Sequence, residues 1–220
     1  MSFDVACCSL YLCTPDRKDL EHFVSECIAG GIDIVQLREK NLEARELIKR
    51  AKLLKRVCSD HGVPFIMNDR PDLALEVDAD GVHVGQDDAP VALARQILGD
   101  EKIIGLSTHH SDEFVAGLQE PVAYLSAGPI VETPTKPGRE ATGIRFITNA
   151  RSLADGSCNR TDPLPFFVTG GVTPEIIPAI VAAGGTRFVV VRYLTESENP
   201  QRNARKLQIA LERATGSGAQ

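Results

Sequence analysis

Charged side chains stand directly behind several short apolar runs of the sequence, where they could carry chemistry. Arg38 and Lys40 alternate behind one run, Asp69 follows a second, and Asp88 follows a third. Two alternating basic side chains could grip a phosphate group, and the alternative is that both are simply solvated. Two carboxylates could hold Mg²⁺, which takes few protein ligands and leaves the rest to water and substrate phosphate. For Asp88 alone, capping of the following helix is an equally good interpretation.

A second group of residues could receive a phosphate near the other end of the sequence. Gly170 and Gly171 precede Thr173 and Pro174, a pair typical of a helix start, so bare backbone N–H groups would gather there. Arg192 follows the last apolar run and could approach the same place. An ordinary glycine turn is the alternative interpretation of this segment.

The segment 128–143, GPIVETPTKPGREATG, is rich in glycine, proline and threonine. We expect a long mobile loop over the site, able to fold over an anionic ligand and bring Lys136 inward; an ordinary exposed loop is the alternative. Four basic residues, two aspartates and one divalent ion would leave a net charge of about +4, comparable in size to a diphosphate plus a monophosphate. The set therefore favours two phosphorylated ligands, with pyrophosphate displaced by the second.

Other reactive residue types fit this chemistry less well. His83 lies within a strand pattern, which favours an interior histidine over a general base. His109 and His110 lack the spacing of a zinc site, and we expect them to face solvent at a helix start. A Schiff-base lysine would need burial to lower its pKa, whereas Lys40 and Lys136 follow strands rather than lie within them.

The elements that must position these residues alternate along the chain. Apolar runs typical of strands recur at 8–14, 32–37, 64–68, 81–85, 102–107, 122–127, 165–170 and 187–192. Segments with helical spacing lie between them, at 19–30, 43–62, 88–99, 112–119, 173–185 and 201–216. We expect 152–164 to be a second loop.

Repetition of a strand and then a helix, with short connections, favours parallel strands and right-handed crossovers. Eight such units in 220 residues predict an α/β fold, a single (β/α)₈ TIM barrel spanning 1–220 with a frayed tail from about 215. Because the ends of all eight strands meet at one mouth of such a barrel, the residues named above should lie together.

The composition agrees with an ordinary globular protein that needs neither disulfides nor a structural metal: 43% of residues are hydrophobic and the net charge is −6. The mild acidity argues against nucleic-acid binding. We expect no membrane span or signal peptide, and therefore a cytoplasmic protein. The six cysteines form no CxxC pair and are expected to be reduced.

Motifs along nearly the whole chain are similar to those of a known enzyme family. They are LYLCTPDR (10–17), GGIDIVQLREK (30–40), MNDRPDLALEVDADGVHVGQDD (67–88), IIGLSTHH (103–110), SAGPIVETPTK (126–136) and TGGVTPE (169–175). Together they resemble the thiamine-phosphate synthase family. The resemblance implies a transferase that joins hydroxymethylpyrimidine diphosphate to hydroxyethylthiazole phosphate, forming thiamine monophosphate and releasing pyrophosphate. It also implies a dissociative path, in which diphosphate departs first and leaves a pyrimidine cation.

The resemblance assigns site residues as well. It implies that Mg²⁺ is bound by Asp69 and Asp88. It implies that the pyrimidine diphosphate is held by Gln36, Leu37, Arg38, Glu39, Lys40, Asn68, Ser107 and Lys136. The thiazole phosphate would be received by Thr133, Pro134, Thr135, Gly171, Val191 and Arg192. The catalytic residues would be Arg38, Lys40, Ser107 and Lys136.

Two positions depart from the family pattern: Arg192 replaces a serine, and Thr169 replaces an apolar residue before the glycine pair. Two other functions stay open. One is a thiazole tautomerase of the same barrel family, which has no evident need for two aspartates together with three basic residues. The other is a ligand-sensing barrel that binds thiazole phosphate without turnover. We expect small-molecule substrates as partners, with neither nucleic acid nor membrane, and self-association into a homo-oligomer stays open.

Overall fold

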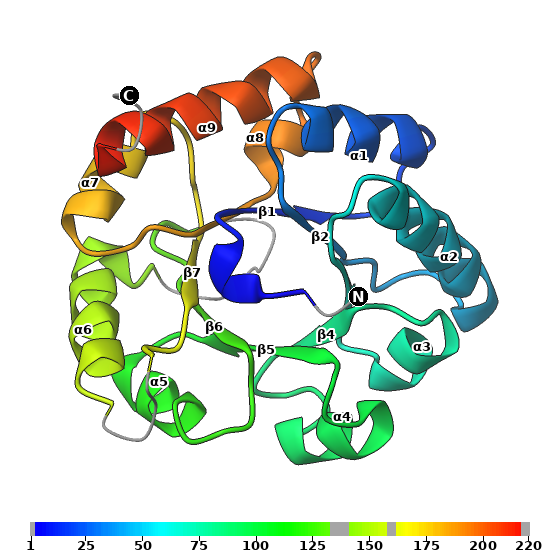
Figure 1. Ribbon diagram of the computed structural model, residues 1–220, viewed down its shortest axis with the longest axis horizontal. Helices are drawn as coiled ribbons and strands as arrows, with labels where there is room; N and C mark the ends of the chain where they lie inside the picture. The colour runs from blue at the N-terminus through cyan, green and yellow to red at the C-terminus, as the bar shows by residue number, and fades with distance from the viewer. Residues whose placement is uncertain (1–2, 133–140, 158–161, 217–220) are drawn as a thin grey trace.

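The computed structural model describes residues 3–132, 141–157 and 162–216. In this part of the chain eight parallel strands close into a barrel, since the last strand pairs with the first (Figure 1). The strands are β1 (Leu10–Thr14), β2 (Ile34–Leu37), β3 (Phe65–Asn68), β4 (Gly81–Val84), β5 (Ile103–Thr108), β6 (Tyr124–Ala127), β7 (Phe166–Thr169) and β8 (Phe188–Val190). The predicted (β/α)₈ barrel is confirmed.

Helices surround the barrel and cover the outer face of its strands (Figure 1). They are α1 (Leu20–Ala29), α2 (Ala44–Asp60), α3 (Pro71–Glu76), α4 (Val91–Leu98), α5 (Ser111–Gly117), α6 (Gly143–Asp155), α7 (Ile177–Ala182), α8 (Arg192–Thr195) and α9 (Pro200–Thr215). A short 3₁₀ helix, η1 (Val5–Cys7), precedes β1. None of the helices in the described ranges has the length and apolar character that crossing a membrane requires.

Two loop predictions are wrong in part. Helix α6 includes the last residue of the predicted loop 128–143 and the first residues of the predicted loop 152–164. Its buried residues are Phe146, Ile147, Ala150 and Ala154, a helical spacing that polar residues between them obscure. The rest of the loop over the site, 133–140, lies outside the described residues, as do 158–161 and the tail from 217.

Two helix starts also differ from the prediction. Helix α7 begins at Ile177 rather than after Thr173, because the Thr173 carbonyl accepts hydrogen bonds from the N–H groups of Ile176 and Ile177 in a preceding turn. Strand β8 ends at Val190, and Arg192 is the first residue of α8 rather than the last of a strand.

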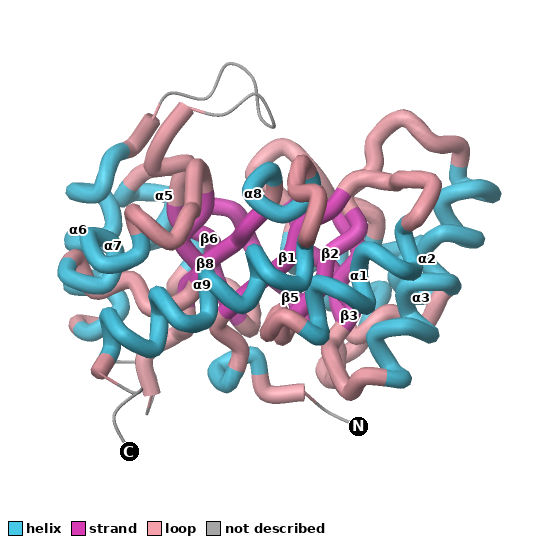
Figure 2. The backbone as a smooth tube through the Cα atoms, turned by 90° about the horizontal axis from the view of Figure 1, so that it is seen from above, coloured by secondary structure: helices cyan, strands magenta, loops and turns pink. Residues whose placement is uncertain are grey.

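The inside of the barrel is filled at the end where the strands begin. A cluster of buried side chains occupies it, formed by Val5, Cys8, Tyr11, Ile34, Ile66, Ile103, Tyr124 and Phe167. Alternate residues of the same strands, such as Leu12, Val35 and Leu125, pack instead against the helices. Figure 2 shows η1 below the strands and α8 above them. Ligands can therefore enter only from the end where the strands finish.

Asp33 joins the starts of β1 and β2 at the filled end. Its carboxylate accepts hydrogen bonds from the N–H groups of Ser9, at 2.7 Å, and Leu10, at 2.9 Å. Burial raises the pKa of Asp33 to about 6 from its ordinary 3.8, although these two hydrogen bonds act in the opposite direction. The native chain therefore binds this proton more tightly than the unfolded chain does.

Replacing Asp33 by asparagine should change how stability depends on pH. Because its folded-state pKa is raised, Asp33 contributes stability that is lost as the pH rises from about 4 to about 6. Relative to the unmodified chain, Asp33→Asn should gain free energy of unfolding across that interval. Denaturant unfolding at several pH values measures the difference, with exposed Asp100→Asn as the control that should show no gain. Parallel pH profiles for Asp33→Asn and the unmodified chain would contradict this prediction.

Candidate active site

A pocket of about 300 Å³ opens where the strands finish, a volume at the lower end of the range for small-molecule sites. Its described lining comes from strand ends and the loops behind them. It consists of Tyr11, Cys13, Gln36, Arg38, Asn68, His83, Ser126, Gly128, Pro129, Thr169, Gly170, Gly171, Val172, Thr173, Val189, Val191, Arg192, Tyr193 and Glu196.

Strand alternation decides which residues of β2 and its extension reach the pocket. Gln36 and Arg38 both line it, and the Arg38 N–H donates to the Thr14 carbonyl at 2.8 Å, which continues the β1–β2 ladder by one residue. Leu37, between them, is buried in the core outside the barrel. The Glu39 carboxylate accepts from the Asn41 N–H at 2.8 Å. Neither Leu37 nor Glu39 is among the described residues that line the pocket, and their predicted roles in holding the pyrimidine diphosphate stay predictions.

Asp69 follows β3 in a left-handed conformation, with φ at 60°, and its N–H donates to the His83 carbonyl at 2.8 Å. Its carboxylate lies within hydrogen-bonding reach of the Asp88 carboxylate and 2.7 Å from the Lys40 ammonium. Burial raises the pKa of Asp69, Lys40 counteracts this rise, and Asp88 adds to it. The two predicted metal ligands therefore stand together.

Asp88 is fixed by its own loop. One carboxylate oxygen accepts from the Gly85 N–H at 2.9 Å, and α4 begins at Val91 with Pro90 as its N-cap residue. The interpretation of Asp88 as a helix cap is therefore wrong. No group of three or more histidine, cysteine, aspartate or glutamate side chains suited to a metal occurs among the described residues. A pair of carboxylates is the donor set that Mg²⁺ accepts when a substrate phosphate supplies further ligands.

The opposite wall of the pocket is made by the glycine pair and the start of α8. Gly170 and Gly171 have φ angles of 98° and 70°, and a Cβ on Gly170 would lie 2.6 Å from the Pro129 Cβ. Glycine is required there both by conformation and by the close approach of the neighbouring loop. Arg192 is exposed at the rim of this wall. Glu196 also lines the pocket and lowers the positive charge that the sequence predicted.

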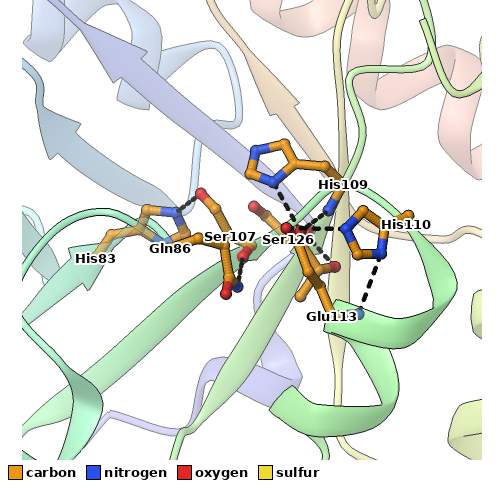
Figure 3. A network of polar contacts seen from close by, with 8 residues as sticks. His83, Gln86, Ser107, His109, His110, Glu113 and Ser126 are labelled. Atoms are coloured by element: carbon orange, nitrogen blue, oxygen red, sulfur yellow. Dashed lines mark hydrogen bonds and ion pairs between the residues drawn. The ribbon is translucent and has the colours of Figure 1, made fainter. Parts of the chain in front are cut away.

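Two pairs of buried polar side chains lie near the carboxyl ends of the strands. The Gln36 amide donates to the Asn68 side-chain oxygen at 3.3 Å. The Ser107 hydroxyl lies 2.9 Å from His83 Nε2, and the Gln86 amide donates to the Ser107 carbonyl at 2.7 Å (Figure 3). His83 is therefore an interior histidine, as the strand pattern predicted.

His109 and His110 enclose Glu113 at the start of α5 (Figure 3). The Glu113 carboxylate accepts from the His109 N–H at 2.7 Å and lies 2.9 Å from His109 Nδ1. Burial would raise the pKa of Glu113, but the contacts with His109 lower it overall. The expectation that both histidines face solvent is wrong for His109, whose side chain is 9% exposed.

Several pocket residues were missed by sequence reasoning, namely Tyr11, Cys13, Ser126, Tyr193 and Glu196. Strand alternation could have found Tyr11 and Cys13, which share the inward face of β1. The position of Glu196, behind a four-residue helix, has no comparable signal. Thr133, Pro134, Thr135 and Lys136 lie outside the described residues, so their predicted roles stay predictions. Lys40 is exposed and paired with Asp69, unlike a buried Schiff-base lysine.

The closed barrel, the pocket at its strand ends and the adjoining carboxylate pair define a (β/α)₈-barrel enzyme. The chain belongs to the thiamine monophosphate synthase family, whose sequence model matches residues 10–194. The thiamine-phosphate synthase of Mycobacterium sp. (strain KMS) is 40% identical over 215 residues, covering 92% of each chain. That of Thermobifida fusca (strain YX) is 41% identical over 203 residues, covering 90% of each. The chain is accordingly a transferase of thiamine biosynthesis.

Solved structures agree with this assignment. The thiamine phosphate pyrophosphorylase from Pyrococcus furiosus superposes with a TM-score of 0.82 at 26% identity, covering 94% of this chain and 96% of that one. A 3-hexulose-6-phosphate synthase superposes with a TM-score of 0.62 at 18% identity, covering 92% of this chain and 99% of that one. The second likeness shows the shared barrel fold alone.

Two substitutions should move the pKa of Asp69 in opposite directions. Lys40→Met removes the ammonium that holds this pKa down and should raise it, whereas Asp88→Asn removes the carboxylate that pushes it up and should lower it. A ¹³C NMR titration of the carboxyl carbon in metal-free buffer measures both shifts. Asp72, whose pKa is lowered by Arg70, should not move and serves as the internal control. Shifts of the same sign would show that the three groups are not arranged as described.

Proposed function

We propose that this enzyme joins hydroxymethylpyrimidine diphosphate to hydroxyethylthiazole phosphate, forming thiamine monophosphate and releasing pyrophosphate. The observation that carries the proposal is the Asp69 and Asp88 carboxylate pair, with Lys40 in contact and Arg38 in the adjacent pocket wall. A diphosphate leaving group needs this combination of a cation site and basic side chains. The cytoplasmic location stays a prediction, and self-association stays open.

The carboxylate pair fits Mg²⁺ on the chemistry of its donors. Two carboxylates within hydrogen-bonding reach repel each other, and one of them already contacts an ammonium group. We propose that Asp69 and Asp88 hold the ion, which would neutralise charge on the departing diphosphate. Lys40, released from Asp69 by the competing cation, would then be available to the diphosphate.

The chain itself positions the diphosphate and keeps water from the reacting carbon. Arg38, half-buried at the end of the β1–β2 ladder, would bind the diphosphate as a planar donor. The aromatic and aliphatic walls from Tyr11 and Val189 would shield the pyrimidine cation of a dissociative path from solvent. Little general-base chemistry is required, which agrees with His83, whose two ring nitrogens are both engaged by buried hydroxyls.

The thiazole phosphate would lie at the opposite wall. Gly171 and Val191 line the pocket there, and Arg192 would add a guanidinium group. The second phosphate would then lie behind β7 and β8, whereas the carboxylate pair follows β3 and β4. The thiazole nitrogen would then face the carbon from which the diphosphate departs.

Pyrophosphate release tests the proposed reaction. With both substrates and Mg²⁺, the unmodified chain should release pyrophosphate in a coupled assay. A thiazole tautomerase or a ligand-sensing barrel would release none, so absence of pyrophosphate would overturn the proposal.

The Asp69→Ala variant should lower the turnover number by at least about tenfold, which corresponds to about 1.4 kcal/mol of barrier. The loss should be in kcat because the carboxylate acts on the developing charge of the leaving group. We expect the same direction for Lys136→Ala. Asp100→Ala, which removes an exposed loop carboxylate, is the control. Unchanged turnover in Asp69→Ala would defeat the metal assignment.

The Arg192→Ala variant should raise the KM for thiazole phosphate by about tenfold, because a charge-assisted hydrogen bond to phosphate is lost. The KM for the pyrimidine diphosphate should stay unchanged. Steady-state kinetics with each substrate varied in turn measures both values, and Arg202→Ala on exposed α9 is the matched control. A rise in the KM for the pyrimidine diphosphate alone would show that Arg192 contacts that substrate and not the thiazole phosphate.

A further inference from the structure

Helix α8 carries side chains that line the pocket, although it is only four residues long. Arg192 is its first residue, Tyr193 its second, and Glu196 its C-cap residue, and all three line the pocket. A helix of this length is not stable alone, because its first turn fixes several residues for one hydrogen bond. Other parts of the chain must therefore hold α8 in place.

The core and α9 hold two sides of α8. The Leu194 side chain is buried in the core that surrounds the barrel. The Asn203 side-chain amide, on α9, donates to the Tyr193 carbonyl at 3.4 Å and to the Ser197 hydroxyl at 3.0 Å. These contacts fix the middle of α8 and the residue that follows its C-cap.

The last carbonyl of α8 is held from the loop behind β1. Arg17 Nη1 donates to the Thr195 carbonyl at 3.2 Å, between residues 178 positions apart in the chain. They meet because β1 pairs with β8, so the loops behind these two strands begin side by side. The last carbonyls of a helix have no partner within it, and a cation at this end interacts favourably with the helix dipole. One guanidinium group supplies both the donor and the charge.

The Arg17 side chain is itself fixed by two neighbours. Its Nε donates to one Asp19 carboxylate oxygen at 2.6 Å, and its Nη2 donates to the other at 3.1 Å. Its guanidinium carbon lies 3.9 Å from the centroid of the ring of Phe23, a buried residue of α1. Bidentate pairing and stacking both depend on the planar guanidinium group. Arg17 is not among the described residues that line the pocket, so it can affect a substrate only through another group.

One peptide group connects Arg17 with Arg192. The carbonyl that Arg17 contacts belongs to the peptide between Thr195 and Glu196. The N–H of the same peptide donates to the Arg192 carbonyl at 3.0 Å. Because a peptide group is planar, its carbonyl and its N–H move together. Release of the Thr195 carbonyl would therefore also disturb the hydrogen bond that holds the Arg192 backbone.

We infer that Arg17 is a positioning residue, which holds α8 by its last carbonyl and thereby fixes Arg192 for binding the phosphate of the second substrate. The inference rests on the proposed function for the identity of that phosphate, whereas the hold on α8 does not. A residue behind β1 thus controls the affinity for a ligand that binds behind β7 and β8.

Amide hydrogen exchange tests the hold on α8 without any substrate. Arg17→Met keeps an aliphatic stem and removes the guanidinium group. The Glu196 N–H should then exchange at least about tenfold faster, because local opening of α8 becomes easier. Arg56→Met is the matched control, since it removes an exposed guanidinium group that pairs with Glu21 on α1, and it should leave this exchange rate unchanged. Unchanged exchange in Arg17→Met would overturn the inference.

Steady-state kinetics tests whether the hold acts through Arg192. Arg17→Met should raise the KM for thiazole phosphate by about three- to tenfold, the size expected for one misdirected hydrogen bond, with the KM for the pyrimidine diphosphate unchanged. In an Arg192→Ala background the same substitution should have no further effect on this KM. Additive increases, or an equal rise in the KM for both substrates, would mean that Arg17 is merely structural and would overturn the inference.

A second variant keeps the test open if Arg17→Met does not fold. Asp19→Ala leaves Arg17 in place but removes the carboxylate that fixes its guanidinium group, and it should also speed exchange at Glu196. Unchanged exchange there would count against the hold. If the unmodified chain releases no pyrophosphate, the proposed function fails, whereas exchange at Glu196 still decides whether Arg17 holds α8.

Discussion

The mouth of the barrel is organised around two carboxylates that the fold forces together. Strands β3 and β4 are neighbours, so the loops behind them begin side by side, and Asp69 and Asp88 cannot separate without breaking backbone hydrogen bonds to His83 and Gly85. A cation beside two half-buried carboxylates offsets their mutual repulsion, which otherwise raises the pKa of Asp69. Lys40 is such a cation, with its ammonium 2.7 Å from the Asp69 carboxylate.

The depth of the pocket is set where the inward-facing side chains of the strands change from apolar to polar. Along β2 the inward residues run from Ile34 to Gln36, and along β3 from Ile66 to Asn68. Apolar side chains fill the lower level and leave no room for a ligand, whereas the polar level above borders the pocket. Tyr11 belongs to both, because it lies in the buried cluster and also lines the pocket.

The apolar runs predicted the barrel because parallel strands buried on both faces are nearly continuous hydrophobic segments. Such segments can be recognised in the sequence without knowing which strands pair. Helix α6 was missed because its apolar residues are diluted by polar ones, and Arg192 was misplaced because a four-residue helix has no periodicity. The contact of Tyr11 with Tyr124 joins residues 113 positions apart. Such a contact depends on barrel closure and on Gly105, where a Cβ would stand 2.1 Å from Tyr124 Cζ. No local sequence pattern reveals either feature.

The loop behind β4 links the two halves of the site. It carries Asp88, which faces Asp69, and Gln86, whose amide donates to the Ser107 carbonyl at 2.7 Å. Strand β4, which precedes this loop, carries His83, and His83 contacts the Ser107 hydroxyl. Ser107 is thus held through its backbone and its side chain by one strand and its loop. One loop therefore supports both the carboxylate pair and the backbone of Ser107.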